Sequence, residues 1–119
     1  MLDQNDLSLR QLVGWLTTPA RCGVYLSVAD IARIGAPLSV SIAPISRRAA
    51  VEQLFRAAAI DERVPELFAA LADEFAAQRD AYLACDSPHL EPWVARSAEG
   101  RATIQALAES WQAGFGTST

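Results

Sequence analysis

The sequence predicts an all-α protein, a small bundle of about five helices, on three observations. Apolar residues recur at three- and four-residue spacings through most of the chain. Serine, aspartate and proline stand where these runs begin, as they do at natural helix starts. The chain has 119 residues, half of them hydrophobic, which is enough for one domain with its own core. We therefore expect a single helical domain over residues 1–119, with frayed ends at 1–5 and 116–119.

The clearest pattern is a pair of helices within residues 46–86. Ser46 is a good N-cap for the first helix, whose apolar face is interrupted near residue 60. Pro65 suits the first turn of the second helix, because a proline there loses no hydrogen bond. The second helix should cover residues 64–83, about 30 Å, and form the spine of the bundle. Its expected apolar stripe consists of Val64, Leu67, Phe68, Leu71, Phe75 and Tyr82.

Two shorter helices are expected before this pair. The first covers residues 7–16 and stops before Pro19. The second begins after Ser27, which forms a capping box with Asp30, and ends at Gly35 as its C-terminal cap. Residues 20–26 connect the two helices, with a turn at Gly23.

Residues 89–92 are expected to open a last helix, with Pro92 in its first turn. Gly114 and Gly116 should end it, because glycine is a poor helix former. Gly100 lies inside this helix and marks either a bend or a close crossing with a neighbouring helix.

The least helical stretch is residues 36–45, which we expect to be partly extended. Leu38, Val40 and Ile42 alternate with serines, the pattern of a half-buried strand. Such a strand could pair with residues 24–26 or across a dimer. The third alternative, which we prefer, is an extended segment that lies on the helices.

The charges divide unevenly along the chain. The net charge is −4, with +2 over residues 1–60 and −6 over residues 61–119, an asymmetry that could orient a partner or a second copy. All ten basic residues are arginine and 23 residues are alanine, as expected of a GC-rich bacterial genome. No apolar run approaches the ~20 residues that cross a membrane, and the first ten residues are polar and acidic. We therefore expect a cytoplasmic protein without a membrane span.

No pattern of reactive side chains points to catalysis. Cys22 and Cys85 lie far apart without a CxxC motif, and we expect reduced, mostly buried thiols. The single histidine, His89, stands alone in a loop. The acidic pairs 62/66 and 73/74 are interpreted as surface charge on helices, because they lack the Glu-x-x-His element of di-iron bundles. Glycine-rich phosphate loops and nucleophile motifs are absent from the sequence. We predict that the protein is not an enzyme and binds no cofactor or metal.

One ten-residue stretch, Leu26 to Gly35 (LSVADIARIG), resembles the opening of bacterial helix-turn-helix domains. The resemblance implies a DNA-binding regulator that uses residues 27–56, with Arg47, Arg48 and Arg56 on phosphates. Prolines bracket the place of the recognition helix, and the net charge of −4 disfavours nucleic acid. This alternative requires that Arg33 and the other three arginines form one exposed patch.

The first hypothesis is a non-enzymatic protein–protein interaction module, a small accessory, adaptor or regulatory protein that acts through the surface of its bundle. Its partner is another protein or, in a homodimer, a second copy of itself. Three tryptophans on amphipathic segments, Trp15, Trp93 and Trp111, belong either to the core or to an interface. A small-molecule-binding bundle is the third hypothesis. The candidate partner-binding residues are Arg33, Arg47, Arg48, Arg56, Trp93 and Trp111.

Overall fold

The computed structural model describes the backbone of residues 2–42 and 46–118, and the side chains of residues 9–42 and 46–109. In this part of the chain the protein is all-α, as predicted, and contains no strand. Six α-helices and two short 3₁₀ turns follow one another: α1 (Leu2–Leu16), α2 (Pro19–Cys22), α3 (Val28–Gly35), η1 (Ala36–Leu38), α4 (Arg47–Ile60), α5 (Val64–Ala84), η2 (Pro88–Leu90) and α6 (Glu91–Ser118).

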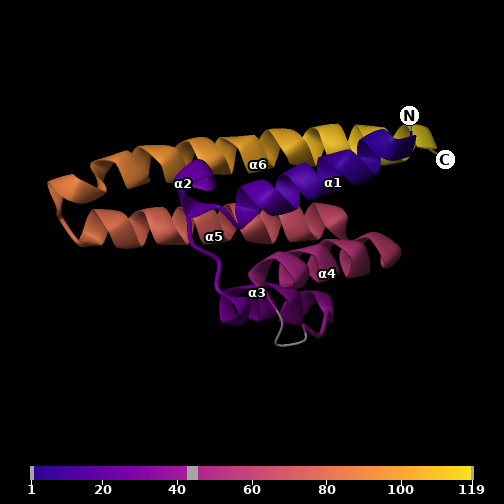
Figure 1. Ribbon diagram of the computed structural model, residues 1–119, viewed down its shortest axis with the longest axis horizontal. Coiled ribbons are helices and arrows are strands. Elements are labelled where there is room, and N and C mark those ends of the chain that lie inside the picture. The colour runs from indigo at the N-terminus through magenta and orange to yellow at the C-terminus, as the bar shows by residue number, and fades with distance from the viewer. Residues whose placement is uncertain (1, 43–45, 119) are drawn as a thin grey trace.

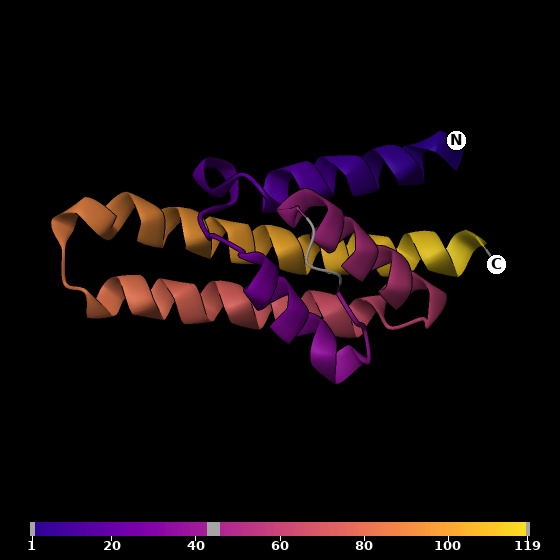
Figure 2. The same ribbon diagram turned by 60° about the horizontal axis from the view of Figure 1, so that its bottom comes forward.

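Helices α5 and α6 form a long antiparallel hairpin (Figure 1) and share the most extensive contact in the molecule. Its loop end projects beyond the other helices, whereas the opposite half is covered by them (Figure 2). Helix α4 packs against α5 and α1, and α3 packs against α4 and α5. Helix α5 is therefore the spine that the sequence predicts.

The core consists of the apolar faces that the helical periodicity predicts. Phe55 and Phe68 meet edge to face with their centroids 5.6 Å apart, and Phe75 is fully buried. The predicted stripe of α5 is buried from Val64 to Phe75. Its last member, Tyr82, is half-buried and donates a hydrogen bond to the carbonyl of Gly23 at 3.0 Å.

Local signals begin the helices where the sequence predicts. The hydroxyl of Ser46 accepts from the amide of Ala49 at 3.2 Å at the start of α4. Ser27 and Asp30 form a complete capping box at the start of α3, with distances of 3.0 and 3.1 Å. Pro65 lies in the first turn of α5. These caps satisfy amides that have no partner within the helix.

Two predicted helix ends differ, and a third helix ends where predicted but without the expected cap. Helix α1 begins at Leu2 rather than at residue 7, since the intervening residues include no helix breaker. Helix α6 continues through Gly114 and Gly116 to Ser118, because a glycine costs only about 1 kcal/mol and does not by itself stop a helix. Gly35 is not a left-handed cap, because its φ is −76°. A Cβ there would lie 3.1 Å from Leu54 Cδ1, so close packing explains this glycine instead.

The 36–45 segment is less extended than predicted. Residues 36–38 form a 3₁₀ turn with Pro37 in its first positions, and Ser39 has a left-handed φ of 61°. Residues 40–42 are irregular, with Val40 buried in the core. Of the three alternatives, pairing with residues 24–26 is excluded, since neither segment forms a strand among the described residues. Residues 43–45 lie outside the described part, and pairing across a dimer stays a prediction.

Two glycines allow α2 to lie directly on α6. A Cβ on Gly23, whose φ is +92°, would lie 2.5 Å from the amide nitrogen of Ser97. A Cβ on Gly100 would overlap the carbonyl oxygen of Cys22 and lie 2.5 Å from Phe75. Of the two alternatives for Gly100, the close crossing is therefore correct.

A membrane-spanning helix would need a long apolar stretch. None of the described helices is both long enough and apolar enough to cross a membrane.

Candidate functional site

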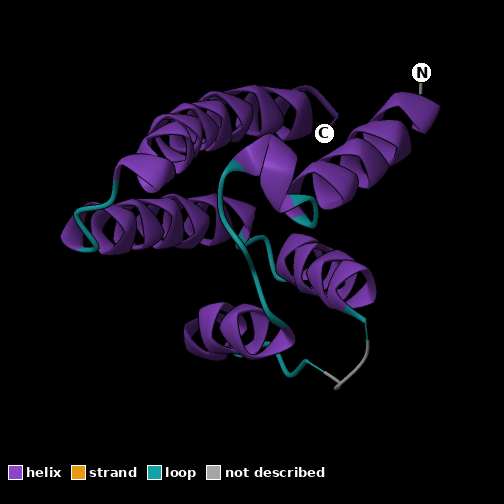
Figure 3. Cartoon of the chain, turned by 60° about the vertical axis from the view of Figure 1, so that its left-hand side comes forward, coloured by secondary structure: helices purple, strands orange, loops and turns teal. Residues whose placement is uncertain are grey.

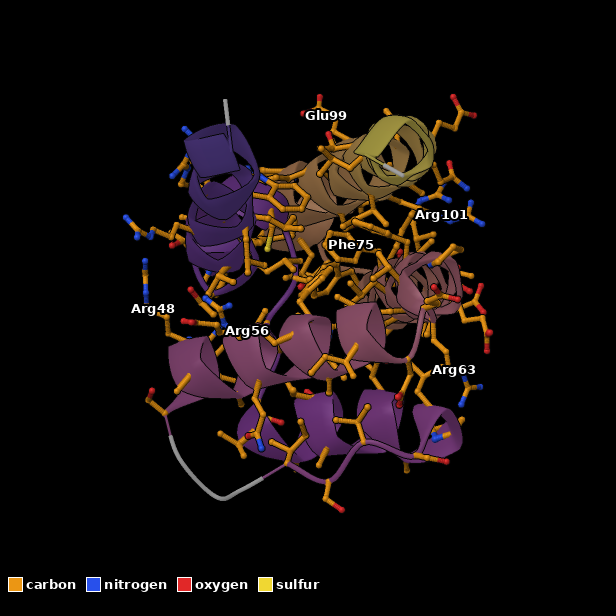
Figure 4. The ribbon with its side chains drawn as sticks, turned by 90° about the vertical axis from the view of Figure 1, so that its right-hand side faces the viewer. Arg48, Arg56, Arg63, Phe75, Glu99 and Arg101 are labelled. Carbon is orange, nitrogen blue, oxygen red and sulfur yellow. The ribbon has the colours of Figure 1, made fainter. Side chains whose placement is uncertain are left out.

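The four arginines that the DNA-binding alternative requires do not form one exposed patch. Arg33 lies between two carboxylates, with its Nη2 atom 2.8 Å from Glu74 and 3.2 Å from Asp30. Arg56 forms an ion pair of 3.0 Å with Glu52 on its own helix. Figure 4 shows Arg48 and Arg56 at separate places along α4. Acidic side chains thus stand among these arginines, the arrangement that argues against a phosphate-binding surface.

Arg47 stabilises the loop before α3 instead of facing solvent. Its Nε donates to the carbonyl of Leu26 at 2.6 Å, and its guanidinium lies 4.2 Å above the centre of the Tyr25 ring. The side chain of Gln78 pairs with both backbone groups of Tyr25, accepting from its N–H at 3.0 Å and donating to its carbonyl at 2.8 Å. The 24–27 loop is therefore held by side chains from α4 and α5.

Glu74, interpreted from the sequence as surface charge, is buried at 9% exposure. It accepts from Arg33 and, at 2.9 Å, from Gln78. A buried carboxylate requires such partners. The hydrogen bond with Glu74 and then that with Asp30 raise the pKa of Arg33 above its ordinary value.

The geometry around α3 differs from a helix-turn-helix motif. The two helices of that motif are joined by a turn of about 3–4 residues. Here α3 and α4 are separated by the whole of residues 36–46. The ten-residue resemblance therefore extends to a capped helix and no further.

The tryptophans lie in different surroundings. Trp15, at the end of α1, is half-buried and stacks on Phe75 with ring centroids 5.8 Å apart. Trp93 is half-buried near the loop end of the hairpin, 6.5 Å from the ring of Tyr82 and 5.3 Å from the guanidinium of Arg96. The side chain of Trp111 lies outside the described residues.

A groove of about 590 Å³ lies where α1, α2 and α6 meet, and we call it the α1/α6 groove. Helix α1 packs against α2 and α4, while α6 packs against α5 and α2. Figure 3 shows α1, which begins at the label N, and α6, which ends at the label C, as separate helices with the short α2 between them. The groove is lined by Arg10, Gln11, Leu12, Gly14, Trp15, Arg21 and Leu107.

The sequence around α2 explains why this groove exists. The hydroxyls of Thr17 and Thr18 donate back to the carbonyls of Val13 and Gly14, at 2.8 and 2.7 Å, where α1 ends. Pro19 then begins α2, which sits directly on α6 because glycines line that contact. The C-terminal end of α1 is thus held near α6, while the rest of α1 leans on α4. Among the described side chains, the groove is left where the end of α1, α2 and α6 meet.

The floor of the groove is apolar and its rim is basic. Leu12 is 5% exposed, and Trp15 and Leu107 pack partly against the core. Arg10 and Arg21 are exposed, and neither forms an ion pair with a described residue. No carboxylate is among the lining residues that the structure describes. An apolar floor edged by two arginines is complementary to a ligand with an apolar group next to negatively charged groups.

The sequence does not reveal this groove. Its arginines stand singly on short helices, and its apolar residues belong to ordinary helical stripes. The spacing of apolar residues shows which face of α1 is apolar, but it does not show whether a neighbouring helix covers that face. Only the basic sign of residues 1–60 could have pointed to this half of the chain.

Reactive groups elsewhere are few. Cys22 is fully buried, and its burial raises the pKa of the thiol above the ordinary value. Cys85 is exposed, contrary to the expectation that both thiols are mostly buried, because α5 ends in the projecting half of the hairpin. Among the described side chains, no three histidine, cysteine or acidic residues lie close enough together to hold a metal.

Comparisons with models of protein families, with curated proteins and with solved structures give no significant match to this chain. The arguments about its function therefore depend on its own geometry.

Proposed function

We propose that the protein is a non-enzymatic interaction module that holds a segment of another protein in the α1/α6 groove. The observation that carries the proposal is an apolar floor, Trp15 and Leu107, which no described side chain fully covers and which is edged by two arginines without an ion pair to any described residue. Binding of a peptide segment in a groove between helices is a recurrent mode of recognition.

The size and framing of the groove support this proposal. Its volume of about 590 Å³ lies within the range of sites that take one compact group. The groove is lined by residues of α1, α2 and α6 and opens to solvent, so a segment of another chain could enter it. Trp15 is held by stacking on Phe75, and such preorganised aromatic side chains favour binding because little side-chain freedom is lost.

Photo-crosslinking in the native host tests the proposal. A benzophenone side chain is placed at Gln11, which lines the groove, or at Asp73, an exposed residue on α5 outside it. We expect one discrete adduct with another protein from position 11 and none from position 73. Leu107→Asp, which places a charge on the apolar floor, should abolish that adduct while circular dichroism shows an intact helical fold.

Three results would contradict the proposal. Equal crosslinking from both positions would mean nonspecific contact. An adduct of twice the mass of this chain would identify a second copy as the occupant. The absence of an adduct from position 11 would mean that the groove is not occupied in the host.

A further inference from the structure

We infer that the segment held in the α1/α6 groove is acidic, with one large apolar side chain flanked by aspartate or glutamate. This inference rests on the proposed function and specifies the chemistry of the partner.

The apolar anchor follows from the floor of the groove. Leu12, Trp15 and Leu107 come from two different helices and converge on one space. An aliphatic or aromatic side chain placed there removes apolar surface from water on both partners, the main driving force of association. One anchor is expected, because the groove holds about 590 Å³ and is bounded at α2.

The acidic flanks follow from the rim. Arg10 on α1 and Arg21 on α2 are both exposed, and neither has an ion-pair partner among the described residues. Glu99 of α6, which is labelled at the top of Figure 4, does not line the groove, and among the described residues no ion pair joins it to either arginine.

Arg10 and Arg21 are distinguished from the other arginines by lining the α1/α6 groove, because Arg48, Arg79 and Arg101 also form no ion pair with a described residue. Half of the ten arginines already interact with acidic or aromatic side chains: Arg33, Arg56 and Arg63 in ion pairs, and Arg47 and Arg96 over aromatic rings. The chain as a whole carries a net charge of −4, so the groove has the opposite sign of charge to the protein as a whole. An acidic segment is repelled by most of the surface and attracted here, which specifies both the place and the partner.

Three pools of fluorescein-labelled peptides test the inference on the intact protein. Each peptide has about twelve residues with a central leucine or phenylalanine. The flanks are aspartate and glutamate in the first pool, asparagine and glutamine in the second, and lysine in the third. Fluorescence polarisation gives the affinity at about 50 and 500 mM salt, because screening weakens exposed ion pairs.

We expect the acidic pool to bind about tenfold more tightly than the neutral pool at low salt, and the basic pool not to bind. The factor follows from two exposed ion pairs, each of which strengthens binding by about 1.5- to 5-fold. The double variant R10A/R21A should reduce the preference to less than about twofold. The matched control R56A/R79A removes the same charge from exposed sites outside the groove and should leave the preference unchanged.

Each alternative result has a defined meaning. If the neutral pool binds as tightly as the acidic pool, and Leu107→Asp abolishes both, the acidic class is wrong while the groove remains a binding site. If no pool binds although the crosslink from position 11 persists, the inference fails and the proposed function stands. If R56A/R79A loses as much preference as R10A/R21A, the attraction is a general charge effect and the inference is overturned. Self-association that the acidic pool does not displace would identify a second copy as the occupant, which overturns both.

Discussion

Replacing Gly100 with alanine tests the contact between α2, α5 and α6 that holds the groove open. A Cβ at this position would overlap the carbonyl oxygen of Cys22 and approach Phe75 Cε2 to 2.5 Å and Cδ2 to 3.0 Å. One of these obstacles is backbone, and the other is a fully buried ring stacked on Trp15. Neither the backbone carbonyl nor the buried ring can change position to make room, so α6 has to move away from α2 and α5.

The expected magnitude combines two opposing terms. In a helix interior, glycine to alanine alone stabilises by about 1 kcal/mol. Forcing an extra carbon into a close-packed contact costs about 1–3 kcal/mol, and the backbone clash places Gly100→Ala at or above the upper end. The net result is a loss of about 2 kcal/mol or more in the free energy of unfolding. For a chain of this size that corresponds to a fall in Tm of roughly 8 °C or more.

Urea unfolding followed by circular dichroism measures the change, with an unchanged m-value showing that the two-state transition is preserved. Gly14→Ala is the matched control, because the same carbon added in α1 would meet only Arg48 Nη1 at 3.7 Å, an ordinary contact. It should stabilise by up to about 1 kcal/mol. Opposite signs are therefore predicted for the same chemical change. If Gly100→Ala is as stable as the native protein, or if both variants shift in the same direction, the close crossing is refuted.

Two further predictions concern the polar contacts of α3. Arg33→Ala should lower the free energy of unfolding by about 1–2 kcal/mol, because it removes a charged hydrogen bond from Glu74, whose side chain is only 10% exposed. The expected loss is smaller than for a fully buried pair, because the side chain of Arg33 is 60% exposed. Arg56→Ala, which breaks a pair with both partners exposed, should change stability by less than about 0.5 kcal/mol, and equal losses in urea titrations would disprove the difference. Burial raises the pKa of Asp30, but hydrogen bonds from Ser27 and Arg33 outweigh it and hold the pKa below its ordinary value. The ionised Asp30 side chain therefore stabilises the fold fully above its unfolded pKa of about 3.9, and this stabilisation is lost as pH falls through the lower pKa of the folded protein. The stability of Asp30→Asn should consequently depend less steeply on pH below about pH 4. An unaltered acid-unfolding profile for that variant would contradict the assignment.

The fold was predictable wherever a local signal decides the structure. Ser46 and Pro65 act on the amides of their own first turn, and the apolar stripe of α5 reflects the period of the helix itself. The helix ends at Gly114 and Gly116 were misassigned because glycine has a small effect that the surrounding sequence overrides.

The features that depend on distant segments were not predictable in the same way. Glu74 looks like a surface residue within its helix, and only the approach of Arg33 from 41 positions earlier allows its burial. The arginines at 33, 47, 48 and 56 share a region of sequence, yet their helices direct them to different partners. The α1/α6 groove depends on the direction of α1 relative to α6, which no spacing of residues encodes.

Chemical-shift mapping with the acidic peptide pool tests the central claim most directly. Amide resonances of the protein labelled with ¹⁵N are followed as the pool is added. We expect the shifts to concentrate in residues 10–15, in α2 (Pro19–Cys22) and around Leu107 of α6, to require about tenfold more peptide in R10A/R21A, and to disappear in Leu107→Asp. Shifts that concentrate at the loop end of the α5/α6 hairpin, or no shifts at saturating peptide, would contradict it.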